Sequence, residues 1–316
     1  MIEVSKFIPE YKYIPVITGP TASGKSSLAL ELCRRTGGEL ISADSMQIYK
    51  GLDIGTAKDS EAERAEIPHH MTDIVEPGTY FNVSDYVTAC YETIGGLLDR
   101  GVLPVICGGT GQYISALYYG FDYGRDASAD EETARLEKEF EENGIDGIYA
   151  RLKERDPEAA AKIHPNNTRR VIRALAVIES TGRTFTEKNS ESTSEGPRYP
   201  FKLFMIDMDR QILYDRINRR VDIMMEEGIE QEARDLYDSD ADKKSTCFQA
   251  IGYKEFKDYF EGKSDIDEAV YNIKLRSRHY AKRQLTWFRA MGDDVIRLSP
   301  DDSGKNVQKV LDTICQ

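Results

Sequence analysis

The sequence predicts an α/β protein in which a parallel sheet is flanked by helices and interrupted by a helical insertion. In the first third of the chain, short apolar runs alternate with segments of helical periodicity, which is typical of parallel sheets. From about residue 125 to 200 the chain is charged and helical, without a strand-like run, and an apolar run returns afterwards. We therefore expect one core, residues 1–124 and 200–316, and an insertion domain at residues 125–199.

The elements expected in chain order are strands that begin in apolar runs and helices that follow them. The expected strands lie at residues 13–18, 39–43, 102–107, 201–207 and 295–298. The expected helices lie at residues 25–35, 83–100 and 265–291. Asn82 or Ser84 suits the N-cap of the second helix.

Composition narrows the class of protein. With 316 residues, 40% of them hydrophobic and 31% charged, the chain is typical of a soluble globular protein. No apolar stretch approaches the roughly 18 residues of a membrane span, and the N-terminus has no secretory apolar core. We expect a cytoplasmic protein without membrane contact. The five cysteines are widely spaced, which suits neither a zinc site nor a disulfide framework.

Residues 19–26, GPTASGKS, follow the first apolar run and fit the phosphate-binding P-loop pattern. Backbone N–H groups of such a loop surround a phosphate at a helix N-terminus, the lysine adds positive charge, and the final hydroxyl can ligate Mg²⁺. The sequence thus predicts a P-loop NTPase-like core with Mg²⁺ as cofactor and Ser26 as its ligand. The residues expected at the phosphate are Gly19, Pro20, Thr21, Ala22, Ser23, Gly24, Lys25 and Ser26.

The P-loop by itself indicates phosphate, not a particular reaction. A hydrolase normally has an Asp at the end of a second strand, but here the third strand ends in Gly108-Gly109-Thr110. Asp44 follows the second expected strand, at the edge where open α/β sheets carry their chemistry, and can bind a metal or accept a proton. A small-molecule kinase remains an alternative, since an Arg-rich helix follows the strand that ends at Asp207.

Two basic segments favour a polymeric anion over a small phosphate ester. Residues 271–289 contain six Lys and Arg and no acidic residue, although the net charge of the chain is −13. Arg278, Lys282 and Arg283 belong to this segment, which also carries aromatic side chains suited to single-stranded RNA. The second cluster lies in the insertion at residues 164–173.

With these residues in view, the chain closely resembles the bacterial tRNA dimethylallyltransferases, also called tRNA isopentenyltransferases. The resemblance runs in order along nearly the whole chain. The matching blocks are GPTASGKS (19–26), LISADSMQIYKGLDIGTAK (40–58), PHHMTDI (68–74), GGTGQYISAL (108–117), HPNNTRRVIRAL (164–175), DRINRRVDIM (215–224), QAIGYKEF (249–256) and YAKRQLTWFR (280–289).

The resemblance implies transfer of a dimethylallyl group from dimethylallyl diphosphate to the exocyclic amine of the adenosine 3′ of the anticodon. The tRNAs are those that read codons beginning with U, so the partners would be an anticodon stem-loop and the prenyl donor. It also implies that Asp44 accepts the amine proton, that Thr110 contacts the diphosphate, and that an arginine of one helix binds it. Arg220 is the best match for that arginine, with Arg216 and Arg219 left open.

The resemblance further implies tRNA contacts in three segments, besides Asp44 and Thr110 and the basic helix. The residues are Ser45, Met46, Gln47, Arg169, Arg170, Val171, Ile172, Arg173, Gln249, Ala250, Ile251, Gly252, Tyr253 and Lys254. Gln112 and Asn167 depart from the residues common in the family, at positions where no catalytic role is expected. The alternatives are an adenylate prenyltransferase that forms cytokinin and a P-loop kinase. A monomer is expected.

Overall fold

The structure is a computed structural model and describes residues 1–121, 127–192, 196–300 and 302–315. A six-stranded parallel sheet has the order β3-β2-β4-β1-β5-β6. The strands are β1 (Ile14–Thr18), β2 (Glu39–Ser42), β3 (His69–His70), β4 (Pro104–Gly108), β5 (Phe201–Ile206) and β6 (Val295–Leu298). All five expected strands are confirmed to within two residues at either end. The two-residue β3 was not predicted, because so short a strand has no periodicity to detect.

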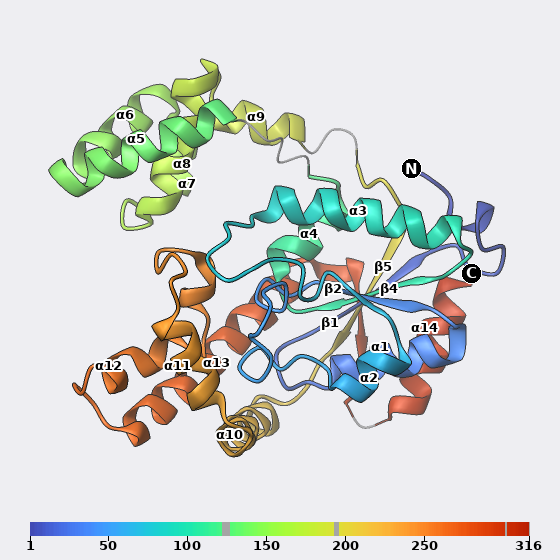
Figure 1. The fold of residues 1–316 in the computed structure, drawn as a ribbon. Helices are drawn as coiled ribbons and strands as arrows, with labels where there is room; N and C mark the ends of the chain where they lie inside the picture. Colours follow the sequence, from blue (N-terminus) through green and yellow to red (C-terminus); the bar gives the residue numbers. More distant parts are fainter. Residues whose placement is uncertain (122–126, 193–195, 301, 316) are drawn as a thin grey trace. The chain divides into compact units, whose positions relative to one another are not determined.

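Helices cover both faces of this sheet in the core (Figure 1). The helices α3 (Val83–Asp99) and α4 (Gly111–Tyr119) lie on one face, and α1 (Lys25–Thr36) and α14 (Ser303–Ile314) on the other. Asn82 caps α3 by accepting hydrogen bonds from Ser84 N–H and Asp85 N–H, as expected for an N-cap residue. The remaining core helices are α2 (Glu61–Glu66), α10 (Arg210–Glu227), α11 (Ile229–Asp238), α12 (Lys257–Phe260) and α13 (Ile266–Ala290).

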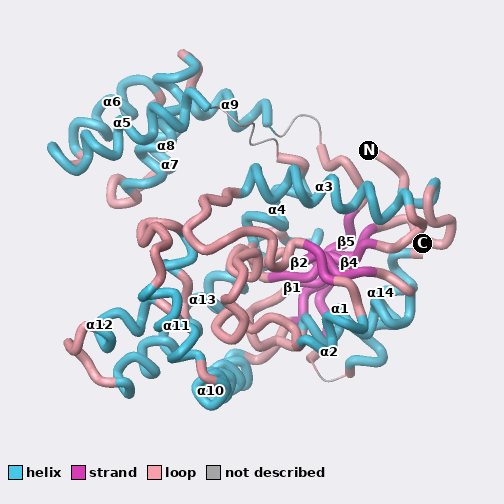
Figure 2. The backbone as a smooth tube through the Cα atoms, in the orientation of Figure 1, coloured by secondary structure: helices cyan, strands magenta, loops and turns pink. Residues whose placement is uncertain are grey.

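By its internal contacts the chain divides into two compact units: Met1–Tyr118 with Pro197–Gln316, and Tyr119–Gly196. The second unit contains helices alone among its described residues, as the cyan segments of Figure 2 show. They are α5 (Ala127–Asn143), α6 (Asp146–Arg155), α7 (Pro157–Lys162), α8 (Thr168–Thr181) and α9 (Phe185–Ser192).

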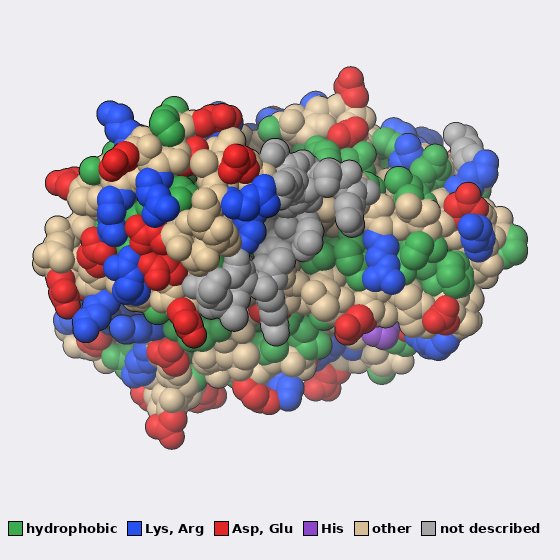
Figure 3. Space-filling view, turned by 90° about the horizontal axis from the view of Figure 1, so that it is seen from above, with side chains coloured by type: hydrophobic (Ala, Val, Ile, Leu, Met, Phe, Trp, Pro, Cys, Tyr) green, Lys and Arg blue, Asp and Glu red, His purple; other side chains and the backbone are tan. Residues whose placement is uncertain are grey.

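The helical unit has a hydrophobic core of its own, centred on the apolar face of α8. Its surface is ionic: Glu179 pairs with Arg135 and Arg151, and Arg151 also pairs with Glu139. Acidic and basic side chains are intermixed on the face of the molecule seen in Figure 3. Opposite charges this close together partly cancel each other's electrostatic potential at the surface.

Two further properties concern thiols and membranes. All five cysteines are free thiols; four are buried and Cys315 is exposed. The described helices include none with the length and apolar content needed to cross a bilayer.

Candidate active site

The candidate site forms where three adjacent strands of the sheet end. The sheet order puts β4 between β2 and β1, so Thr110 after β4 lies between Asp44 and the P-loop. Thr110 is held tightly there: its N–H donates to Ala43 O at 3.1 Å, and its Oγ1 accepts from Ser45 N–H at 2.9 Å. Asp44 and the P-loop, which the sequence placed on separate strands, thus meet at one edge.

The P-loop adopts the conformation needed to present N–H groups to an anion. Gly24 has φ +95° and Ala22 φ +62°, both in the left-handed region, and α1 begins directly after Gly24 without a side-chain cap. The uncapped helix start leaves N–H groups of this turn for a ligand. Three predicted members of the cradle do not offer an N–H group. Pro20 has none, Thr21 N–H donates to Gln284 Oε1 at 2.9 Å, and Ser23 N–H donates to Pro20 O at 3.3 Å.

Two partly buried cations supply the positive charge of the site. Burial lowers the pKa of Lys25, and the same cause lowers the pKa of Arg220, which reaches the cavity from α10. Arg216 and Arg219 are exposed and do not line the cavity, so among the three arginines it is Arg220 that faces the P-loop lysine across the pocket. Desolvated cations of this kind favour an anionic ligand that restores their lost solvation.

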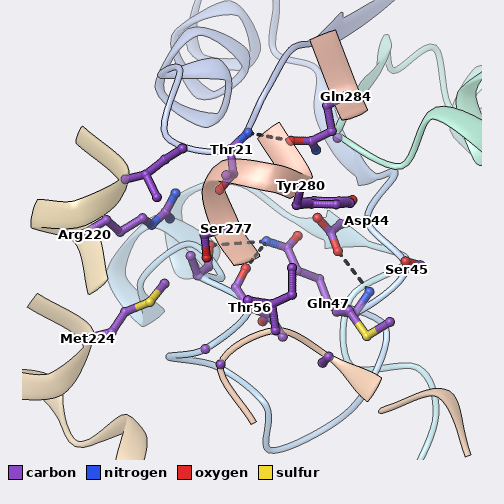
Figure 4. A pocket seen from close by; sticks show the side chains of 18 of the residues that line it. Thr21, Asp44, Ser45, Gln47, Thr56, Arg220, Met224, Ser277, Tyr280 and Gln284 are labelled. Carbon is purple, nitrogen blue, oxygen red and sulfur yellow. Dashed lines mark hydrogen bonds between the residues drawn. The ribbon is translucent and has the colours of Figure 1, made fainter. Parts of the chain in front are cut away.

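These groups surround a cavity of about 270 Å³ (Figure 4). One wall is apolar and comes from α10 and α13, with Ile217, Val221, Met224 and Ile273. The opposite side carries Asp44, Ser45 and Thr56. A diphosphate with a short apolar tail matches this division between cationic, apolar and hydrogen-bonding walls.

Asp44 is only partly buried, and one of its oxygens has a structural role. Its Oδ1 accepts from Met46 N–H at 2.9 Å, which leaves Oδ2 for a ligand. Tyr280 from α13 lies beside it in Figure 4, and burial together with the nearby Asp44 charge raises the pKa of that phenol. The phenol therefore stays protonated and can donate a hydrogen bond.

The cavity residues that the sequence analysis missed include Asp59, Ser277, Tyr280 and Gln284. Asp59 accepts from His69 Nε2 at 3.0 Å and adds a carboxylate to the same cavity as Lys25. The three others lie on α13 at spacings of three and four residues, which places them on one helix face. The spacing of these three residues can be read from the sequence, but the segment was interpreted from its basic residues as an RNA-binding helix.

Some of the predicted RNA-contact residues line the cavity, whereas others are buried inside the protein. Ser45, Met46, Gln47 and most of residues 249–254 line the cavity. Gln47 has its amide engaged, with Oε1 accepting from Ser42 Oγ and Nε2 donating to Thr56 O and Ala57 O. Tyr253 is 5% exposed and donates to Glu232 Oε1 at 2.6 Å, so it packs within the protein instead of lining the cavity.

In the helical unit the predicted segment has two kinds of side chain. Val171 and Ile172 are 0% and 3% exposed and belong to the hydrophobic core of that unit. Arg169 and Arg170 are exposed. If RNA binds this segment, it therefore contacts the arginines and not the buried Val171 and Ile172.

Several cations of α13 are paired in the structure, so this helix carries less unpaired positive charge than its sequence suggests. Lys274 pairs with Asp222, Arg276 with Glu255 and Arg289 with Asp207. Arg278 donates to Asn218 Oδ1 at 2.6 Å. Arg283, by contrast, lines the cavity, with its guanidinium 5.5 Å from the ring centre of Tyr280.

The oxygen donors present suit a hard cation only in part. Among the described residues, no cluster of three His, Cys, Asp or Glu side chains is arranged to hold a metal ion. Ser26, Asp44 and Asp59 nevertheless line one cavity, and Mg²⁺ is commonly held by one or two protein oxygens together with phosphate and water. The donor set therefore fits a Mg²⁺ ion that is bound jointly with a diphosphate.

Comparisons with known proteins identify the relatives of this chain. The family profile described as IPP transferase matches residues 47–291, and that described as Isopentenyl transferase matches residues 12–68. The tRNA dimethylallyltransferase of Oceanobacillus iheyensis is 44% identical over 299 residues, which cover 94% of this chain and 95% of the relative. That of Bacillus subtilis is 45% identical over 276 residues, 87% of each chain.

Solved structures give the same result. The tRNA isopentenylpyrophosphate transferase from Bacillus halodurans superposes with a TM-score of 0.71 and 40% identity, covering 96% of this chain and 95% of its own. A eukaryotic dimethylallyltransferase acting on tRNA superposes with a TM-score of 0.80 and 31% identity, covering 92% of this chain and 74% of its own. The first profile spans both the core and the helical unit.

Proposed function

The chain belongs to the family of tRNA dimethylallyltransferases, and from this premise we propose that it transfers a dimethylallyl group from dimethylallyl diphosphate to tRNA. The acceptor we propose is the exocyclic amine of the adenosine immediately 3′ of the anticodon, in tRNAs that read codons beginning with U. Diphosphate is released. We place this reaction in the cytoplasm.

One observation carries the proposal: two desolvated cations, Lys25 and Arg220, line the same cavity as Asp44. An allylic diphosphate reacts when negative charge on its leaving group is stabilised, and buried cations are strong stabilisers because little water screens them. A carboxylate in the same cavity supplies the acceptor for the proton that the amine must lose.

In the proposed reaction, the adenine amine nitrogen donates its electron pair to C1 of the dimethylallyl group as the C1–O bond breaks. The bonding pair leaves with the diphosphate, which Lys25 and Arg220 stabilise. Asp44 accepts the proton from the amine, while Met46 N–H holds its other oxygen. The hydroxyl of Thr110, fixed through Ser45 and Ala43, contacts the leaving group.

Ser26 and the carboxylate of Asp59 are the residues that would hold Mg²⁺, because the free oxygen of Asp44 is needed for the amine proton. When bound, the ion would neutralise charge on the diphosphate oxygens. Since Ser26 lies at the start of α1, it would act alongside the N–H groups of the P-loop.

We propose that the base reaches the cavity unstacked, because an amine within a stacked loop cannot approach C1. Arg283 at the cavity and the exposed Arg169 and Arg170 are our candidates for the RNA backbone. These cations support RNA over free AMP as acceptor, because a mononucleotide does not need them. We propose a monomer as the active unit.

The test uses radiolabelled dimethylallyl diphosphate, Mg²⁺ and three possible acceptors: an anticodon stem-loop with adenosine 3′ of the anticodon, the same RNA with guanosine there, and AMP. We expect label in the first RNA alone, located to that adenosine by nucleoside mass spectrometry. Label in AMP but not in RNA would establish the adenylate prenyltransferase instead. Turnover of ATP without prenyl transfer would establish a kinase or hydrolase.

A further inference from the structure

Gln284 joins two loops that carry the reacting groups. It lies within α13 and is 4% exposed, although it is polar. Its Oε1 accepts from Thr21 N–H of the P-loop at 2.9 Å, the bond drawn in Figure 4. Its Nε2 donates to Gly109 O, also at 2.9 Å. A single buried amide thus connects the phosphate cradle with the residue that precedes Thr110.

On the Thr110 side, the amide completes the fixing of one peptide group. The peptide between Gly109 and Thr110 has its carbonyl oxygen bound by Gln284 and its N–H bound by Ala43 O at 3.1 Å. A peptide held at both polar atoms cannot rotate without breaking a buried hydrogen bond. The position of the Thr110 hydroxyl therefore depends on Gln284.

On the P-loop side, a second peptide group is fixed in the same way. The peptide between Pro20 and Thr21 has its carbonyl oxygen bound by Ser23 N–H at 3.3 Å and its N–H bound by Gln284. The N–H groups from Gly24 onwards belong instead to the start of α1, where we expect the phosphate to bind. Loss of Gln284 therefore loosens the front of the loop and leaves the helix start in place.

Contact distances show that the bridge leaves no spare room. A Cβ atom on Gly109 would lie 2.2 Å from Gln284 Nε2, while the next neighbour outside this side chain, Gly19 O, would be 3.5 Å away. Gly109 does not have a positive φ, so alanine is compatible with its backbone. An alanine at Gly109 therefore acts on the bridge alone, by displacing the amide.

We propose that Gln284 is a positioning residue that sets the distance between the diphosphate cradle and the Thr110 hydroxyl. The inference rests on the proposed prenyl transfer and concerns the same site. Because the helix start still binds the diphosphate, loss of the bridge affects the transition state more than donor binding. A displacement of about 1 Å in such a geometry lowers the rate about 100-fold.

The experiment compares Gln284→Ala, Gly109→Ala and the double variant with the wild type. Gln308→Ala is the matched control, since Gln308 is an exposed glutamine of α14 whose amide donates to its own helix neighbour Asp312. Diphosphate binding measured by calorimetry counts intact sites in each sample, and kcat is expressed per intact site. Steady-state transfer to the anticodon stem-loop gives kcat and the donor KM.

We expect each single variant to lower kcat about 100-fold, with the donor KM changed by less than about threefold. The double variant is expected to match Gln284→Ala, because the added methyl then occupies vacated space. Gln308→Ala should match the wild type. Losses that multiply in the double variant, or a kcat of Gln284→Ala near that of the wild type, would overturn the inference.

The two proposals fail in different ways. A wild-type protein that binds diphosphate but transfers no prenyl group overturns the proposed function, and the inference falls with it. Normal transfer by the wild type and by the Gln284 variants overturns the inference alone. A loss of activity that equals the loss of diphosphate sites shows that Gln284 only stabilises the fold, which also overturns it.

Discussion

At the scale of single residues, the cavity combines charge with burial. Lys25 and Arg220 both have a pKa lowered by desolvation, so each cation stands where water solvates it poorly. Such a pair is unfavourable in the empty cavity and favourable around an anion. We therefore expect diphosphate binding and charge stabilisation during its departure to depend on the same two side chains.

Replacement of Arg220 with glutamine should therefore weaken both steps. We expect kcat/KM for dimethylallyl diphosphate to fall by about 100-fold to 1000-fold, the range found when one preorganised donor to a developing anion is removed. Steady-state transfer at varied donor concentration measures it. Arg216→Gln, on the exposed side of the same helix, is the control and should leave kcat/KM unchanged. Equal losses in the two variants would contradict the assignment of Arg220.

Asp44→Asn tests the proton acceptor without disturbing its loop. Asparagine keeps an Oδ1 that accepts from Met46 N–H, so the local hydrogen bond survives. We expect single-turnover transfer to slow by about 100-fold or more, the usual contribution of a general base. Diphosphate affinity, measured by calorimetry, should stay within about threefold of wild type. Transfer at the wild-type rate would show that Asp44 only shapes the turn.

At the scale of elements, a loop of the cavity is held by a distant helix. Glu232 of α11 accepts from the N–H groups of Asp53, Ile54 and Gly55 at 2.8–2.9 Å. Its Oε1 also accepts from Tyr253 OH, whose ring leaves no room for a Cβ on Gly55. One carboxylate thus fixes the loop that continues to Thr56 at the cavity wall.

Removal of that carboxylate should destabilise the core unit. For Glu232→Ala we expect the free energy of unfolding to fall by about 2–4 kcal/mol, because several hydrogen bonds to one charged group are lost together. Urea denaturation followed by circular dichroism measures it. Glu230→Ala, two residues earlier in the same helix turn, removes only an exposed pair with Arg234 at 3.6 Å and should change the value by less than about 0.5 kcal/mol.

At the scale of the whole molecule, half of the cations of α13 are paired with acidic residues. The net charge is −13, and three of the cations on α13 are paired with acidic residues from other segments. Because the net charge is negative, we expect a polyanion that reaches the cavity to depend on local positive charge there. Arg283 has this position.

We expect Arg283→Glu to weaken binding of the anticodon stem-loop about tenfold or more and to leave the donor KM within about threefold. The slope of log K against log salt should also fall by about one, the amount for one lost phosphate contact. Filter binding at several salt concentrations measures both. Arg289→Glu near the end of α13 is the control, because Arg289 pairs with Asp207. A large rise in the donor KM of Arg283→Glu would instead assign this arginine to the diphosphate.

The class of fold, the P-loop and the candidate Asp44 could be predicted from the residues alone, whereas Thr110 and Arg220 became candidates through the family resemblance. Strand hydrophobicity, helix periodicity and the Gly and Lys positions of a phosphate loop are local properties, so they can be predicted before any contact is known. The ends of the five predicted strands lie within two residues of the observed ends. The choice among the three arginines was not local, since it depends on which face of α10 is turned to the cavity.

Which of these residues lie close together could be learned only from the tertiary structure. The insertion of β4 between β2 and β1 puts Thr110 between Asp44 and the P-loop, and this order is not the order of the strands in the chain. Because α13 packs against the P-loop, Gln284 hydrogen-bonds to both Thr21 and Gly109. Cations that form a basic run in the sequence are paired with acidic residues from other segments. These outcomes depend on contacts between segments far apart in the chain, for which local periodicity carries no signal.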